Sequence, residues 1–162
     1  MRKFQKIFIS LLSVLVLGLM ISSSQIYAQE LKFEVNHIAN GFEKIGEKIT
    51  LFLKFSKTSK VDFYEYLAEK RLAEISYVIE ANQIDSVEPT ASRYSTYIGV
   101  LTNYVEANKV TSKKGDLVKM FERHSKILTN LQSKFKHDSG WWLAIQNDIN
   151  NTKTFSEKIK TL

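Results

Sequence analysis

The sequence predicts an all-α fold, an up-and-down antiparallel bundle of four to five helices behind an N-terminal signal peptide. Apolar residues recur at alternating intervals of four and three, which is the spacing of one helix face. One proline and six glycines in 162 residues are too few for a β-sandwich, which needs a turn about every 8–12 residues. The links between the helical segments are short, so successive helices are expected to be antiparallel neighbours.

Residues 1–28 have the pattern of a secretory signal peptide. Three basic residues lie within the first six positions, residues 7–21 are almost wholly apolar, and Ala28 stands where signal peptidase would cut. An uncleaved anchor is the alternative, but a spanning helix needs roughly 20 apolar residues and this run is shorter. We therefore expect a secreted or extracytoplasmic protein of the cell envelope, anchored in the membrane only if the leader is retained.

After this leader we expect a tether at residues 29–36 and a helical bundle domain at residues 37–162. Removing residues 1–28 takes away three basic residues and no acidic residue, which lowers the formal net charge from +6 to +3. That charge is too small and too dispersed for a nucleic-acid partner. The absence of cysteine excludes disulfides, thiolate metal sites and a lipoprotein anchor.

The first helix is expected from about residue 37 to residue 55. Its apolar stripe predicts a helix packed along its length against others, and consists of Ile38, Phe42, Ile45, Ile49 and Phe52. The second helix is expected over about residues 59–82, with Thr58 or Ser59 as its N-terminal cap. Its stripe consists of Val61, Tyr64, Ala68, Leu72, Ile75 and Ile79.

Three further helices follow. Asp85 and Glu88 have the spacing of a capping box at the start of the third helix, whose stripe is Val87, Ala91, Tyr94, Ile98, Leu101 and Val105. The stripe of the fourth helix is Leu117, Phe121, His124, Leu128, Leu131 and Phe135. The last segment begins at Trp141 and is expected to be interrupted at residues 150–152; its apolar residues are Trp142, Ile145, Ile149, Phe155 and Ile159.

The second helix carries a family resemblance. Residues 68–74 read Ala-Glu-Lys-Arg-Leu-Ala-Glu, and Glu-Lys followed by isoleucine occurs twice in the first helix, at residues 43–45 and 47–49. With the link at residues 56–60, the segment 40–108 resembles a small bacterial family of exported helical domains that is classed only as a domain of unknown function. The resemblance implies an exported helical domain, and it supplies no activity and no functional residues.

Arg71 is the first candidate interaction residue. It lies at the edge of the apolar face, with Glu74 three residues further on and either Glu43 or Glu47 across the seam to the first helix. We expect an Arg–Glu ion pair that fixes the register of the two helices, because the planar guanidinium suits buried pairs. An anion-binding arginine is the functional alternative.

His124 is the candidate pocket residue, because it takes an apolar-stripe position in the fourth helix. Metal or haem sites in bundles need converging partners from facing helices, and the only Glu-x-x-His spacing is Glu34 to His37 in the tether. We therefore expect a histidine that is satisfied within the seam. Convergence of His124 with an acidic residue of a neighbouring helix would instead favour a sensor of a ligand or metal.

Aromatic residues supply the remaining candidates. Tyr97 and Tyr104 are one heptad apart and are expected to line one rim of the third helix, either packed in the seam or facing a partner. Trp141 and Trp142 point about 100° apart, so one of them leaves the core, and Trp141 is the candidate contact residue. The sequence contains no nucleophile, phosphate-loop or zinc-protease motif.

These observations predict a non-catalytic interaction or structural module without a cofactor. Its expected partner is another envelope protein or a second copy of the chain, with no nucleic acid and no membrane contact except through a retained leader. The alternative is an extracytoplasmic helical bundle that senses a ligand or metal.

Overall fold

The computed structural model describes residues 31–162, so the predicted signal peptide lies outside the described part. Five α-helices and two short 3₁₀ helices occur in residues 31–162, with no strand, and all lie in one compact unit, Phe33–Leu162. The predicted all-α bundle is confirmed. The α-helices are α2 (Gly41–Phe52), α3 (Lys57–Glu80), α4 (Val87–Asn108), α5 (Lys114–Gln132) and α6 (Gly140–Lys160).

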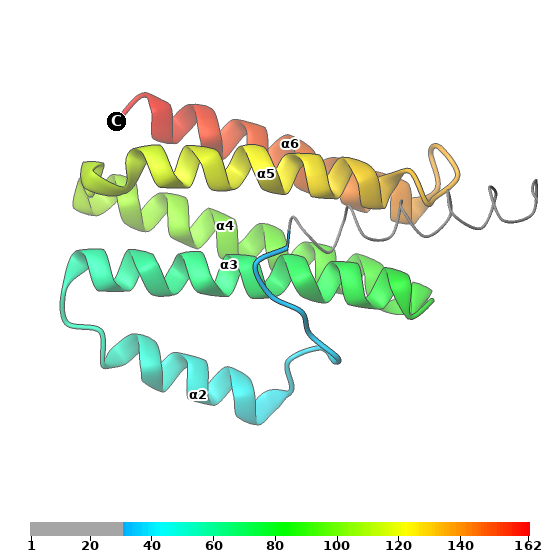
Figure 1. The fold of residues 1–162 in the computed structure, drawn as a ribbon, viewed down its shortest axis with the longest axis horizontal. Helices are drawn as coiled ribbons and strands as arrows, with labels where there is room; N and C mark the ends of the chain where they lie inside the picture. The colour runs from blue at the N-terminus through cyan, green and yellow to red at the C-terminus, as the bar shows by residue number, and fades with distance from the viewer. Residues whose placement is uncertain (1–30) are drawn as a thin grey trace, which may run out of the picture. The chain divides into compact units, whose positions relative to one another are not determined.

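Consecutive helices run in opposite directions, as Figure 1 shows. Helices α3 and α4 form one antiparallel pair, and α5 and α6 form another. The two pairs meet mainly through α4 and α6, which run in the same direction. Helices α4 and α5 are consecutive but share no extensive contact within the described residues. The core therefore lies between two stacked helical hairpins.

The core is built from the predicted stripes of α3, α4 and α5. Every stripe residue of α4 is buried, and so are the stripe residues of α5 from Leu117 to Leu131. Phe135 follows the end of α5 and is only half-buried. In α3 the predicted stripe is also buried, apart from a half-buried Tyr64. Removing these side chains from water contributes about 25 cal/mol per Å2 of apolar surface, which is the main force holding the bundle together.

Helix α6 corrects one prediction, because it is continuous through residues 150–152 where an interruption was expected. Thr152 lies inside it, fully buried, and its hydroxyl donates to the carbonyl oxygens of Asp148 and Ile149. A polar side chain that bonds to its own helix needs no break in that helix.

The helix starts correct three further predictions. Helix α2 begins four residues later than expected, after Asn40, whose side chain forms a reciprocal capping box with Glu43. Ser56 caps α3, in place of Thr58 or Ser59, by accepting a hydrogen bond from the Ser59 backbone N–H. No side-chain cap forms at the start of α4, because residues 84–86 make a 3₁₀ turn that leads directly into the helix.

Candidate functional site

The most unusual surface of the molecule is the outer side of α2. The sequence predicts that its apolar stripe packs against other helices, and this prediction is wrong: Phe42 is 88% exposed and Phe52 is 81% exposed. We call this surface the α2 apolar face, and it consists of Phe42, Ile45, Ile49, Phe52, Leu53 and Phe55. Figure 1 shows α2 on the outside of the bundle beside α3.

The other side of α2 is polar and faces α3. Glu47 is buried, and its carboxylate forms ion pairs with Lys70, at 2.9 Å, and with Arg71. Just before α2, the backbone N–H of Ala39 donates to Glu74 Oε1 at 2.9 Å. Helix α2 is therefore attached to α3 through charged and polar groups, and this attachment turns its apolar side outward.

Arg71 is the centre of this attachment. Its guanidinium is fully buried and forms ion pairs with Glu47 and Glu74, so the predicted Arg–Glu pair is confirmed, with Glu47 as the partner across the seam. Tyr97 covers the guanidinium, with 4.8 Å from Arg71 Cζ to the ring centroid. Arg93 Nη1 lies 3.2 Å from the second oxygen of Glu74. We call these residues, together with Lys70, the Arg71 cluster.

His124 belongs to a second buried cluster that spans three helices. Its Nδ1 lies 2.9 Å from the hydroxyl of Tyr94 in α4, and its Nε2 lies 3.0 Å from Glu69 Oε2 in α3. Arg123 forms an ion pair with the other oxygen of Glu69. Burial would raise the pKa of Glu69, but the hydrogen bonds and charges of His124 and Arg123 overcome this effect and lower the pKa to about 2.

The His124 cluster therefore shows the convergence with an acidic residue that would favour a sensor. Both ring nitrogens, however, face protein partners, and the side chain is fully buried. Arg123 places a positive charge on the same carboxylate that a cation would need. Within residues 31–162 no group of three or more histidine, aspartate or glutamate side chains is arranged to hold a metal ion. The cluster is best explained as a structural connection between α3, α4 and α5.

Asp148 in α6 is a buried carboxyl that faces α4. The hydroxyl of Ser95 donates to its Oδ1, while its Oδ2 is buried without a hydrogen-bond partner. Burial raises the pKa of Asp148 to about 7, and the hydrogen bond from Ser95 opposes this only in part. Asn151 completes the group by donating to Ser95 Oγ at 2.8 Å.

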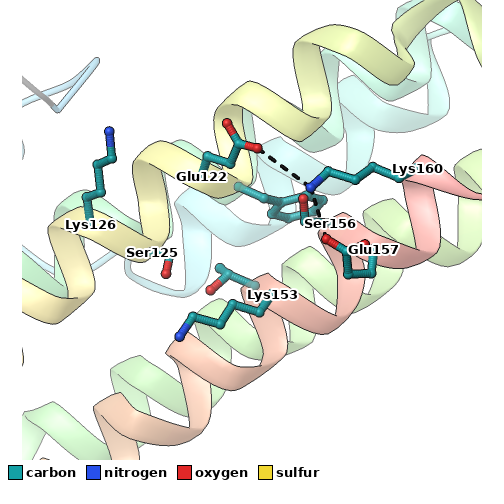
Figure 2. A pocket seen from close by; sticks show the side chains of 9 residues that line it. Glu122, Ser125, Lys126, Lys153, Ser156, Glu157 and Lys160 are labelled. Carbon is teal, nitrogen blue, oxygen red and sulfur yellow. Dashed lines mark hydrogen bonds and ion pairs between the residues drawn. The ribbon is translucent and has the colours of Figure 1, made fainter.

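A groove of about 360 Å3 lies between α5 and α6, with Phe121 among its lining residues. Figure 2 shows that Lys160 reaches both Glu122 and Glu157, with Nζ–Oε1 distances of 3.7 and 2.9 Å. The ammonium ends of Lys126 and Lys153 point away from each other in the same view. The cations of this groove do not converge on one point, so they do not form an anion site.

The aromatic candidates mostly contact neighbouring side chains. Tyr104 packs on Tyr64 of α3 at a centroid distance of 5.3 Å, and Tyr97 covers Arg71. These two tyrosines therefore pack in the seam between α3 and α4. Trp141 is 41% exposed and packs partly against Phe135 in the turn before α6.

A comparison with protein families matches residues 41–158 to one family, described as Domain of unknown function (DUF5667). The chain belongs to the DUF5667 family. No curated protein and no solved structure was found to match it. The matched segment begins with the first residue of α2 and ends two residues before the end of α6. Helix α2 and its apolar face are therefore part of the DUF5667 domain, together with the four-helix core.

Several residues of these clusters in the DUF5667 domain were not predicted from the sequence, namely the buried Glu69 and Asp148 and the half-buried Arg123 and Ser95. For Asp148 a signal exists: residues 145, 148, 149, 152, 156 and 159 are all buried on one face of α6. That spacing is helical, but half of its members are polar, so a search for apolar stripes passes over it. No comparable signal in the sequence pairs Glu69 with Arg123, because 54 residues separate them.

Proposed function

We propose that this DUF5667 protein is an exported, non-catalytic interaction module of the bacterial cell envelope, which binds its partner through the α2 apolar face. The observation that carries the proposal is the exposure of six large apolar side chains on and next to one helix. Contiguous apolar surface of this kind is costly in water and is typical of interaction sites.

Export is supported by the sequence of residues 1–28, with its basic start, apolar run and small-residue exit. In residues 31–162 no helix is long and apolar enough to cross a membrane. A non-catalytic role is supported by the two charged clusters, in which the acidic groups are held by arginine, lysine or histidine neighbours inside the protein.

Site-specific photocrosslinking in the native host tests this proposal. A photoreactive phenylalanine analogue replaces Phe52 in the full chain, and irradiation is expected to join the face to its partner in an extracytoplasmic fraction. The control carries the analogue at Lys119, an exposed position on α5, and is expected to give no such adduct. A chain that stays in the cytoplasm, or a Phe52 position that reacts no more than the Lys119 position, would contradict the proposal.

A ligand- or metal-sensing bundle is the second candidate, and the contact between His124 and Glu69 is the observation in its favour. Zinc at 100 times its dissociation constant would add about 2.7 kcal/mol to the free energy of unfolding. We expect no such stabilisation from zinc, because both nitrogens of His124 face protein groups. A rise in the melting temperature with zinc that is lost in His124→Gln would favour the sensor.

A further inference from the structure

We propose that the α2 apolar face docks into the surface of a bilayer that contains anionic lipids. This inference rests on the proposed function, since it names the partner of the same face. A helix that carries large apolar side chains on one side and lysines near its edge is suited to lie in the plane of a membrane interface.

The shape of the face fits a bilayer surface. Helix α2 has 12 residues and is therefore about 18 Å long. Phe42 lies at its start and Phe52 at its end, while Ile45 and Ile49 project between them. The exposed Leu53 and Phe55 continue the surface beyond the helix. Aromatic and branched apolar groups along one side can enter the headgroup region together while the rest of the protein stays in water.

The charges around the face fit an anionic surface. Helix α2 has two acidic residues, Glu43 and Glu47, and both lie on the side away from the apolar face: Glu47 is buried in the Arg71 cluster, and the half-buried Glu43 lies 3.1 Å from the exposed His37. Lys48 is exposed next to the apolar face, one turn after Lys44 on the same edge. The charge that α2 presents to a partner is therefore positive, as binding to anionic lipids requires.

The same charges disfavour a second copy of the chain as the occupant. In an antiparallel pair of α2 helices, the same edge of each helix lies beside its counterpart on the other copy. Lys44 and Lys48 of one copy would therefore face the same lysines of the other. Like charges in such positions are destabilising. The acidic residues that could relieve this repulsion are already bound on the inner side of α2.

Vesicle co-sedimentation of residues 29–162 tests the inference. The apolar run in residues 7–21 would bind vesicles by itself, and Phe33–Leu162 forms a compact unit without it. We expect binding to vesicles of phosphatidylglycerol and phosphatidylcholine, and at least about 10-fold weaker binding to phosphatidylcholine alone or in 0.5 M salt. A cooperative thermal melt of the same preparation establishes that it is folded.

Two matched pairs of variants localise the binding. Leu53 and Leu143 are both leucines, 56% and 51% exposed; Leu53 directly follows α2, whereas Leu143 lies in α6. Leu53→Gln is expected to weaken vesicle binding about 10-fold, whereas Leu143→Gln leaves it unchanged. Lys48→Gln is expected to weaken binding about 5-fold to the anionic vesicles alone, and Lys119→Gln on α5 leaves it unchanged.

Three results would overturn the inference. Absence of vesicle binding is one, and equal loss of binding in Leu53→Gln and Leu143→Gln is another. The third is a dimer in solution that does not bind vesicles and that Leu53→Gln dissociates. The first and third outcomes leave the proposed interaction role intact if the Phe52 photocrosslink still forms, because that experiment detects any partner of the face.

Discussion

Helices α2 and α5 have the same spacing of apolar residues and opposite environments. In α5 the stripe from Leu117 to Leu131 is buried in the core, together with Met120 and Ile127 beside it. In α2 the stripe is exposed, and the one buried residue is Glu47. The α5 helix is held by apolar contacts, whereas α2 is held by the ion pairs of the Arg71 cluster.

This difference shows that apolar periodicity predicts a face which needs a partner and does not say where that partner is. For α5 the partner is the rest of the same chain. For α2 the described part of the chain covers the polar side, so we infer that the apolar side is covered by another component. The following predictions test the two modes of attachment, from the largest expected effect to the smallest.

The largest effect is expected for Arg71→Met, which removes the positive charge at the centre of the Arg71 cluster. Glu74 stays buried with only Arg93 and the Ala39 N–H, and Glu47 keeps only Lys70. Removing one partner of a buried ion pair lowers the free energy of unfolding by about 3–5 kcal/mol. Urea unfolding of Arg71→Met and the native chain measures this difference. Arg93→Met, at a half-buried position, is the control, and we expect it to lower the free energy of unfolding by less than Arg71→Met does. Equal stability of Arg71→Met and the native chain would show that the cluster is not needed for folding.

The second prediction concerns Asp148, whose pKa is about 7 in the folded protein. Between pH 3.8 and 7 the folded state keeps a proton that the unfolded chain releases, so stability falls as the pH rises through this window. The fall is up to about 4 kcal/mol, at 1.36 kcal/mol per pKa unit. Asp148→Asn cannot ionise, so we expect it to be more stable than the native chain above pH 7.

Thermal unfolding at pH 4 and pH 8 measures this difference. At pH 4 the native chain and Asp148→Asn are expected to melt at similar temperatures, because Asp148 is then protonated when folded. The control is Asp85→Asn, at an exposed position before α4, which should follow the native chain at both pH values. An equal difference between Asp148→Asn and the native chain at both pH values would contradict the prediction.

A smaller and local effect is expected for Glu47→Gln, which weakens the attachment of α2. Hydrogen bonds to charged groups contribute about 1.5–3 kcal/mol, so amide hydrogen exchange in α2 should become roughly 10- to 100-fold faster. Exchange in α4, whose stripe is buried in the core, is the internal control and should not change. Faster exchange in both helices to the same degree would mean that α2 opens only with the whole fold.

The smallest effect is expected for Ile49→Ala on the α2 apolar face. Ile49 is exposed, so truncating its side chain leaves no cavity in the protein. The free energy of unfolding should therefore change by no more than about 0.5 kcal/mol. Ile98→Ala in the core of α4 removes the same atoms from a fully buried site, at a cost of about 2–5 kcal/mol. Similar losses for the two variants would show that the α2 stripe is buried.

Much of the fold follows from the sequence because three of the five described helices, α3, α4 and α5, bury nearly all of the residues that their periodicity predicts. Every residue of the predicted α4 stripe, from Val87 to Val105, is buried. The sequence also predicts Glu43 or Glu47 as the partner of Arg71 on the first helix, and the structure shows that this partner is Glu47. These predictions depend on spacing within one helix or on a short link, and such local relations are visible in a sequence.

The candidate site is harder to predict from the sequence than the fold, for a physical reason. Whether Ile45 and Ile49 are covered depends on how α2 is rotated against α3, and we infer that the ion pairs of one buried residue, Glu47, determine that rotation. The position of Asp148 beside Ser95 depends on contacts between α4 and α6, 53 residues apart in the chain. Neither relation leaves a periodic signal in the sequence.

The central claim is that α2 is attached by its polar side and leaves its apolar side open. The chain has no cysteine, so a single introduced thiol reports the accessibility of one position in residues 29–162. We expect Ile49→Cys to react with a thiol reagent in the folded protein about as fast as in an unfolded peptide, and Ile98→Cys to react only when the protein unfolds. Protection of Ile49→Cys to the same degree as Ile98→Cys would contradict the claim.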